Sequence, residues 1–140
     1  MRPDLFQLHG AETVARCREV EARFGIPVMK AIKVETQADA EQAYAYVQAC
    51  EMVLFDAKAP KGMAGALPGG NGLSFDWRLI AGMAGKFPFM LSGGLTPENV
   101  AAAIRLTGAR AVDVSSGVET SPGVKDARLI QHFLAAAKAA

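Results

Sequence analysis

Two glycine- and serine-containing runs in the C-terminal half of the chain could bind an anion. The first is Phe89-Met-Leu-Ser-Gly-Gly-Leu-Thr-Pro-Glu-Asn-Val100, and the second, one helix length later, is Ala111-Val-Asp-Val-Ser-Ser-Gly-Val-Glu119. In each run a short apolar strand is predicted to open into small residues, which let the main chain approach a ligand closely. Thr96 and Pro97 are predicted to begin a helix whose free N–H groups face the same point. The two runs therefore predict adjacent, phosphate-sized sites.

The elements that position these runs follow from the alternation of apolar, strand-like segments with helical periodicity, which is typical of a parallel sheet. Each predicted strand precedes a helix, and the strands are expected at 5–9, 28–34, 52–56, 89–92 and 111–114. Gly25 is predicted to end the first helix, Thr36 with Asp39 to form a capping box at the start of the second, and a helix after Ser74 to carry Trp77. At about 28 residues a unit, eight such units would reach the size of a complete (β/α)₈ barrel. An open doubly-wound sheet is the competing architecture, but it usually places its phosphate glycines after the first strand. We therefore expect an α/β fold, a partial TIM barrel of five βα units with an all-parallel sheet, as one incomplete domain over 1–140.

Composition restricts the partners. The chain is 51% hydrophobic and 21% charged with a formal net charge of +1, which suits one domain with an ordinary core. The absence of a basic block argues against nucleic acid, and the absence of a long apolar run or secretion signal argues against a membrane and for a cytoplasmic location. Cys17 and Cys50 are isolated, so we interpret them as small buried hydrophobes rather than a bridge or a metal pair.

Five motifs in this order resemble the phosphoribosylanthranilate isomerase family. They are Gln7-Leu-His-Gly10, Leu54-Phe-Asp-Ala-Lys58, Gly69-Gly-Asn-Gly-Leu-Ser-Phe-Asp-Trp77, Leu91-Ser-Gly-Gly-Leu-Thr-Pro-Glu-Asn99 and Val112-Asp-Val-Ser-Ser-Gly-Val-Glu119. Each motif alone is weak, but all five at spacings of one βα unit or a multiple of it make a strong signal. The resemblance implies the C-terminal portion of that enzyme, from the fourth barrel strand onward, so that the five units correspond to strands 4 to 8.

The resemblance also implies an activity. The family carries out an Amadori rearrangement in tryptophan biosynthesis, converting N-(5-phosphoribosyl)anthranilate to 1-(2-carboxyphenylamino)-1-deoxyribulose 5-phosphate. An acid protonates the furanose ring oxygen so that the ring opens, and a base removes the proton from C2. The implied partner is a phosphorylated small molecule, and no cofactor or metal is expected.

Each matching position takes a role from the resemblance. Asp56 is implied to be the acid, and Gln7, His9 and Asp113 are implied to contact the substrate. The implied phosphate-binding residues are Gly70, Gly72, Gly93, Gly94, Ser115, Ser116 and Gly117. Plainer interpretations exist, because an aspartate at a strand end is often a turn or cap residue and a lone histidine is often a surface or core residue.

The family's general base is a cysteine in a Lys-Ile-Cys-Gly type motif, which this sequence lacks, as it lacks a counterpart to a substrate-binding arginine. Neither Cys17 nor Cys50 is predicted at the carboxyl end of a strand, where the catalytic groups of a barrel lie. We therefore expect a truncated isomerase with little or no activity as an isolated chain. A five-stranded arc would also expose two edges, to be covered by a missing N-terminal segment or by self-association.

Two alternatives stay open. One is a non-catalytic phosphate-binding barrel fragment or interaction module that keeps the anion site without a base. The other is a different phosphate-binding barrel such as indoleglycerol-phosphate synthase, which Asp56 and Gln7-Leu-His9 fit less well.

Overall fold

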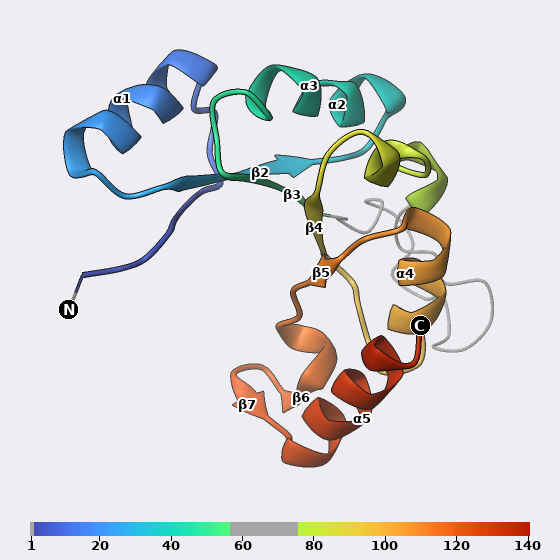
Figure 1. The fold of residues 1–140 in the computed structure, drawn as a ribbon. Coiled ribbons are helices and arrows are strands. Elements are labelled where there is room, and N and C mark those ends of the chain that lie inside the picture. Colours follow the sequence, from blue (N-terminus) through green and yellow to red (C-terminus); the bar gives the residue numbers. More distant parts are fainter. Residues whose placement is uncertain (1, 57–75) are drawn as a thin grey trace.

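The computed structural model describes residues 2–56 and 76–140, and its main feature is a five-stranded parallel sheet (Figure 1). The strands lie in the sheet in chain order, and each pairs in parallel with the next. They are β1 (Phe6–Leu8), β2 (Val28–Lys33), β3 (Met52–Asp56), β4 (Phe89–Ser92) and β5 (Ala111–Val112). The five expected strands are present, and all their carboxyl ends lie along the same edge of the sheet.

The α-helices in this part of the chain are α1 (Val14–Phe24), α2 (Gln37–Glu41), α3 (Ala43–Tyr46), α4 (Val100–Thr107) and α5 (Ala127–Lys138). Three short 3₁₀ turns accompany them: η1 (Trp77–Leu79), η2 (Met83–Gly85) and η3 (Ser116–Val118). Figure 1 shows α1, α2 and α3 along one side of β2 and β3, and α4 beside α5 in the C-terminal half. None of these helices is both long and apolar enough to span a bilayer.

Two local signals for helix ends are confirmed. Gly25 ends α1 with φ of 60°, and its N–H donates to the Glu21 carbonyl. The Thr36 hydroxyl accepts from the Asp39 N–H while the Asp39 carboxylate accepts from the Thr36 N–H, which is the capping box expected at the start of α2.

The core lies between the sheet and the helices, because alternate residues of a strand face opposite sides of the sheet. Phe55, Phe89 and Leu91 are buried against the helical layer, and the rings of Phe55 and Phe89 meet edge to face with centroids 5.1 Å apart. Trp77 lies in the same cluster. This packing turns the alternate residues Asp56 and Ser92 to the other face of the sheet.

The expected fold class, a partial (β/α)₈ barrel of five βα units corresponding to strands 4 to 8 with an all-parallel sheet, is wrong. A second sheet is antiparallel, with β6 (Glu119–Ser121) paired to β7 (Val124–Lys125). Gly123 supplies the positive φ that a tight hairpin turn favours, at 82°, and its N–H donates to the Glu119 carboxylate at 3.1 Å. The helix expected to carry Trp77 is replaced by the short turns η1 and η2. Residues 2–56 and 76–140 therefore form an α/β fold with one parallel and one antiparallel sheet.

Candidate functional site

A cavity of about 170 Å³ lies at the carboxyl ends of β3, β4 and β5. Its lining comes from the ends of these three strands and the loops that follow β4 and β5: Asp56, Ser92, Gly93, Gly94, Leu95, Asp113, Val114, Ser115, Ser116 and Gly117. Because parallel strands all end at this edge, residues far apart in sequence meet here. Seven of the residues predicted from the sequence as site residues line this one cavity.

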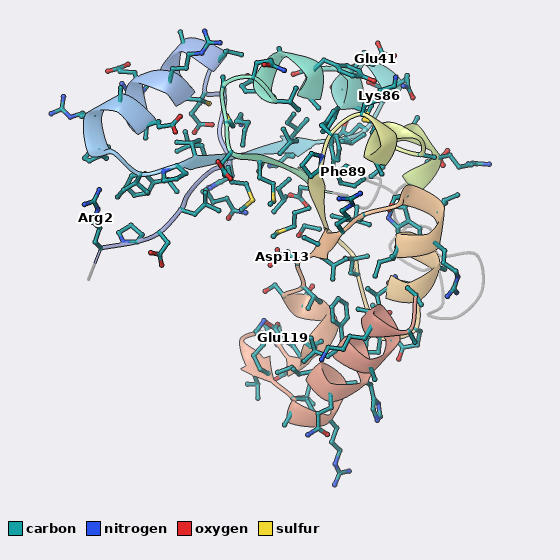
Figure 2. The ribbon with its side chains drawn as sticks, in the orientation of Figure 1. Arg2, Glu41, Lys86, Phe89, Asp113 and Glu119 are labelled. Atoms are coloured by element: carbon teal, nitrogen blue, oxygen red, sulfur yellow. The ribbon has the colours of Figure 1, made fainter. Side chains whose placement is uncertain are left out.

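Asp56, Ser92 and Asp113 are polar residues that line the cavity at the strand ends. Asp56 and Ser92 are register partners on adjacent strands, and the Ser92 hydroxyl donates to Asp113 Oδ2 at 2.8 Å. Asp113 comes directly after β5, and its N–H continues the ladder by donating to the Leu91 carbonyl at 2.8 Å. Figure 2 shows Asp113 at this strand end. The Asp113 carboxylate, which the sequence placed within an apolar strand, therefore has a hydrogen-bond partner and faces the cavity.

The loop after β4 bends sharply at two glycines. Gly93 and Gly94 have φ of 82° and 68°, and the Asn99 side chain closes the loop by donating to the Gly94 carbonyl at 2.9 Å and accepting from the Thr96 N–H at 2.8 Å. The expectation that Thr96 and Pro97 begin a helix with free N–H groups at the site is wrong, since α4 begins at Val100. The Asn99 side chain holds residues 96–99 in a turn, and because its oxygen accepts from the Thr96 N–H, that N–H is not free for a ligand.

The loop after β5 packs directly on the loop after β4. A Cβ atom added to Gly117 would overlap the Leu95 carbonyl, so the two main chains come together at a point where a side chain does not fit. No hydrogen bond between described residues uses the N–H groups of Gly93, Gly94, Ser116 or Gly117. These residues line the cavity, and main-chain N–H groups without an acceptor are the donors that anion-binding concavities use.

The remaining predicted residues lie elsewhere or outside the described part. Gln7 in β1 and His9 just after it are exposed and do not line the cavity, which lies at the other end of the sheet order. The strand registers place Gln7 on the same face of the sheet as Asp56. Gly70 and Gly72 fall in residues 57–75, outside the described residues. The roles of these four residues remain predictions.

The two cysteines lie away from the cavity. Cys17 is buried in α1, and Cys50 precedes β3 at the opposite edge of the sheet. Burial, together with the neighbouring Cys17, raises the pKa of the Cys50 thiol to about 12. A thiol with such a pKa stays protonated near neutral pH, so Cys50 is not a proton acceptor there.

Sequence reasoning missed a buried ion pair that anchors the loop after β1. The Lys30 ammonium, whose side chain is 5% exposed, donates to the Gly10 carbonyl at 2.8 Å and lies 3.1 Å from Glu12 Oε2. The Gly10 N–H in turn donates to both Glu12 oxygens. Lysine in the apolar strand Val28–Lys33 was the available signal, because a buried ammonium requires a partner.

We expect Glu12→Gln to make the protein's stability less dependent on acid pH. Burial raises the pKa of Glu12, but main-chain hydrogen bonds and the Lys30 ammonium outweigh it and hold the pKa below its ordinary value of 4.5. A lowered pKa stabilises the fold above the ordinary value and loses that contribution as pH falls through the lowered one. The variant should be about 1–3 kcal/mol less stable at pH 7, because Lys30 keeps its charge without a carboxylate. Urea unfolding from pH 7 to pH 3 should show the two stability curves converging.

Glu19→Gln is the matched control, because Glu19 pairs with Arg16 on an exposed surface of α1, where ion pairs contribute little. Equal losses for the two variants, or a gap at pH 7 that persists at pH 3, would contradict the role given to Glu12.

Polar side chains around a cavity at the carboxyl ends of parallel strands are the arrangement of α/β enzymes, whose active sites lie at that edge of the sheet. Within this class, the model of the N-(5'phosphoribosyl)anthranilate (PRA) isomerase family matches residues 1–136. The chain belongs to this family of isomerases.

Individual relatives of the chain have the name of the same family. An N-(5'-phosphoribosyl)anthranilate isomerase of Parvibaculum lavamentivorans is 58% identical over 140 residues, 100% of this chain and 65% of the relative. That of Rhodospirillum centenum is 62% identical over 136 residues, 97% of this chain and 63% of the relative. The chain thus spans a little less than two thirds of the length of these relatives.

Solved structures also match. Phosphoribosyl anthranilate isomerase from Thermotoga maritima aligns with a TM-score of 0.80 and 42% identity, over 98% of this chain and 62% of that one. A phosphoribosyl anthranilate isomerase in complex with reduced 1-(o-carboxyphenylamino)-1-deoxyribulose 5-phosphate aligns with a TM-score of 0.77 and 38% identity, over 98% of this chain and 60% of that one. Because these structures match nearly all of this chain, the family's α/β fold replaces the expected description as a C-terminal portion made of barrel strands 4 to 8.

Proposed function

We propose that the protein isomerises N-(5-phosphoribosyl)anthranilate to 1-(2-carboxyphenylamino)-1-deoxyribulose 5-phosphate in tryptophan biosynthesis. The observation that carries the proposal is the single cavity that joins Asp56 to the two glycine- and serine-containing loops, in a chain of the isomerase family. The substrate has a phosphate at one end and a ring oxygen to be protonated nearer its middle. One cavity therefore offers both an anion site and an acid.

The phosphate binds at the two loops in this proposal. N–H groups of Gly93, Gly94, Ser116 and Gly117 have no acceptor among the described residues, and a phosphate supplies strong acceptor oxygens. The loops hold these donors in place before the ligand arrives, because Gly117 packs on the Leu95 carbonyl and Asn99 ties Gly94. Gly70 and Gly72 are proposed to add to this site by family resemblance.

Asp56 is proposed as the general acid. Its carboxyl gives a proton to the furanose ring oxygen, the bond from that oxygen to the anomeric carbon breaks, and the nitrogen lone pair forms the Schiff base. Loss of the C2 proton to a base then gives the enolamine, which tautomerises to the ketone. Asp113, fixed by Ser92, is proposed to accept hydrogen bonds from substrate hydroxyls. The rearrangement moves protons within one molecule, and the proposal includes no cofactor.

No residue of this chain is proposed as the base. Cys17 and Cys50 do not line the cavity, and the thiol of Cys50 is held in its protonated form. We therefore expect the 140-residue chain alone to turn the substrate over slowly or not at all, while binding its phosphate.

Ligand binding tests the proposal without depending on the base. The probe is reduced 1-(o-carboxyphenylamino)-1-deoxyribulose 5-phosphate, titrated calorimetrically, with the same compound lacking its phosphate as the control. We expect saturable binding of the phosphorylated compound and at least about tenfold weaker binding of the control, since charge-assisted hydrogen bonds to the anion are lost. Equal affinity for the two compounds would contradict the proposal. Saturable binding without turnover by the protein isolated from its own cells would favour a non-catalytic phosphate-binding module.

A further inference from the structure

We propose that Lys125 is a positioning residue of the phosphate site, holding Ser115 so that the serine hydroxyl donates its proton to the bound phosphate. The inference rests on the proposed function, because it concerns the anion site described there. Lys125 itself lies outside the cavity, in the hairpin formed by β6 and β7. The hairpin was not expected from the sequence, and this contact gives it a role at the site.

The contact is made by one ammonium group. Lys125 Nζ lies 2.9 Å from the Ser115 carbonyl oxygen, 3.1 Å from Ser115 Oγ and 2.6 Å from Glu119 Oε1. Ser115 lines the cavity and begins the η3 turn, in which its carbonyl also accepts from the Val118 N–H. One lysine of the hairpin thus holds both the main chain and the side chain of a residue at the anion site.

The number of hydrogens on the ammonium determines how Lys125 acts. A lysine ammonium has three N–H donors and no acceptor, and the three contacts above account for all of them. It therefore has no donor left for a phosphate and works through Ser115. A serine hydroxyl has one proton and two acceptor positions. Because Lys125 donates to Oγ, the hydroxyl proton is turned away from the ammonium and is available to an acceptor in the cavity.

Glu119 keeps the ammonium in place. Its side chain is 13% exposed, with Oε1 paired to Lys125 and Oε2 accepting from the Gly123 N–H at the hairpin turn. Figure 2 shows Glu119 in this C-terminal region, below the end of β5. The pair carries no net charge, so its effect on a phosphate comes from orientation of Ser115 more than from long-range attraction. Such an effect is little screened by salt, in contrast to the attraction of an unpaired surface charge.

A double-mutant cycle on the full chain tests the inference. Binding of inorganic phosphate and of ribose 5-phosphate is measured for wild type, Lys125→Met, Ser115→Ala and the double variant, at 0.05 M and 0.5 M sodium chloride. We expect each single variant to bind both probes about tenfold more weakly, as for loss of one hydrogen bond to a charged group. At 0.5 M sodium chloride, where salt screens the Glu119 carboxylate left without its partner, the double variant should be no weaker than either single one, because both changes remove the same hydrogen bond. Lys125→Met should still weaken binding at 0.5 M sodium chloride, because the lost orientation of Ser115 is not screened by salt, whereas repulsion from the unpaired Glu119 carboxylate is.

Lys86→Met is the matched control, because Lys86 is an exposed lysine that donates to Tyr44, and neither residue lines the cavity, so the change should leave binding unchanged. Urea unfolding checks that each variant is folded, and Lys125→Gln replaces Lys125→Met if the latter is not. Any one of three results would overturn this inference without touching the proposed function. They are wild-type affinity in Lys125→Met, a roughly hundredfold loss in the double variant, as multiplied effects would give, and an effect of Lys125→Met that disappears at 0.5 M salt. Failure of the wild-type chain to bind either probe would overturn it together with the phosphate site of the proposed function.

Discussion

Asp56→Asn should lower kcat for the proposed isomerisation by about 10²–10⁴-fold, the usual contribution of a positioned acid or base. Asparagine has nearly the shape of aspartate and can donate a hydrogen bond to the ring oxygen, but it cannot transfer a proton. Affinity for the reduced product analogue should therefore change only a few-fold. Turnover is measured with protein purified from the cells that naturally make it, by the fluorescence change as N-(5-phosphoribosyl)anthranilate is converted. Growth of the same cells without tryptophan is a second measurement.

The matched control for this prediction is Asp76→Asn. Asp76 is also a partly exposed aspartate, but it pairs with Arg78, caps η1 and does not line the cavity. Its replacement should leave kcat within about twofold of wild type. Retention of normal turnover in Asp56→Asn, with the cavity still binding the analogue, would assign the acid to another residue.

Gly117→Ala should disrupt the phosphate site and destabilise the fold. The added methyl group would overlap the Leu95 carbonyl, which is main chain and cannot move aside by a rotamer change. Forcing atoms into a packed interior costs about 1–3 kcal/mol, and we expect the upper part of that range here. Moving the two loops apart also displaces the Gly94 and Ser116 donors from a common ligand. Affinity for ribose 5-phosphate should fall at least about tenfold, because each loss of about 1.4 kcal/mol in binding free energy lowers affinity tenfold.

Gly85→Ala is the same chemical change at a position with open space. Gly85 lies in η2, does not have a positive φ, and a Cβ there would meet nothing within 4 Å. This variant should keep phosphate affinity and have equal or slightly higher stability, because alanine restricts the unfolded chain. Equal behaviour of the two variants, by titration and by urea unfolding, would mean that the close approach of the loops has no part in binding.

Local signals predicted much of the framework. Apolar runs at 52–56 and 89–92 became the buried strands β3 and β4, and the Thr36 and Asp39 pair became the capping box at α2. These features depend on neighbours within a few residues, or on the alternation of apolar side chains along one strand, and both can be read from a single sequence.

Non-local contacts account for the errors. Residues 76–85 form 3₁₀ turns where a helix was expected, and residues 119–125 form a hairpin where the chain was expected to remain part of a βα unit. The hairpin depends on Glu119 reaching Gly123 and Lys125, and the start of α4 depends on Asn99 reaching back to Gly94 and Thr96. Side-chain hydrogen bonds of this kind compete with helix formation, and composition alone does not show which will form.

The sequence by itself determined which residues can do chemistry and which strand carries each of them, because residue type and periodicity are local properties. The family to which these motifs belong was also recognisable from their order and spacing. Only the tertiary structure decided that Asp56, Asp113 and the two loops share one cavity while Gln7 and His9 do not line it. Strand register and the close contact of Gly117 with Leu95 set those distances, and both are properties of packing between segments far apart in the chain.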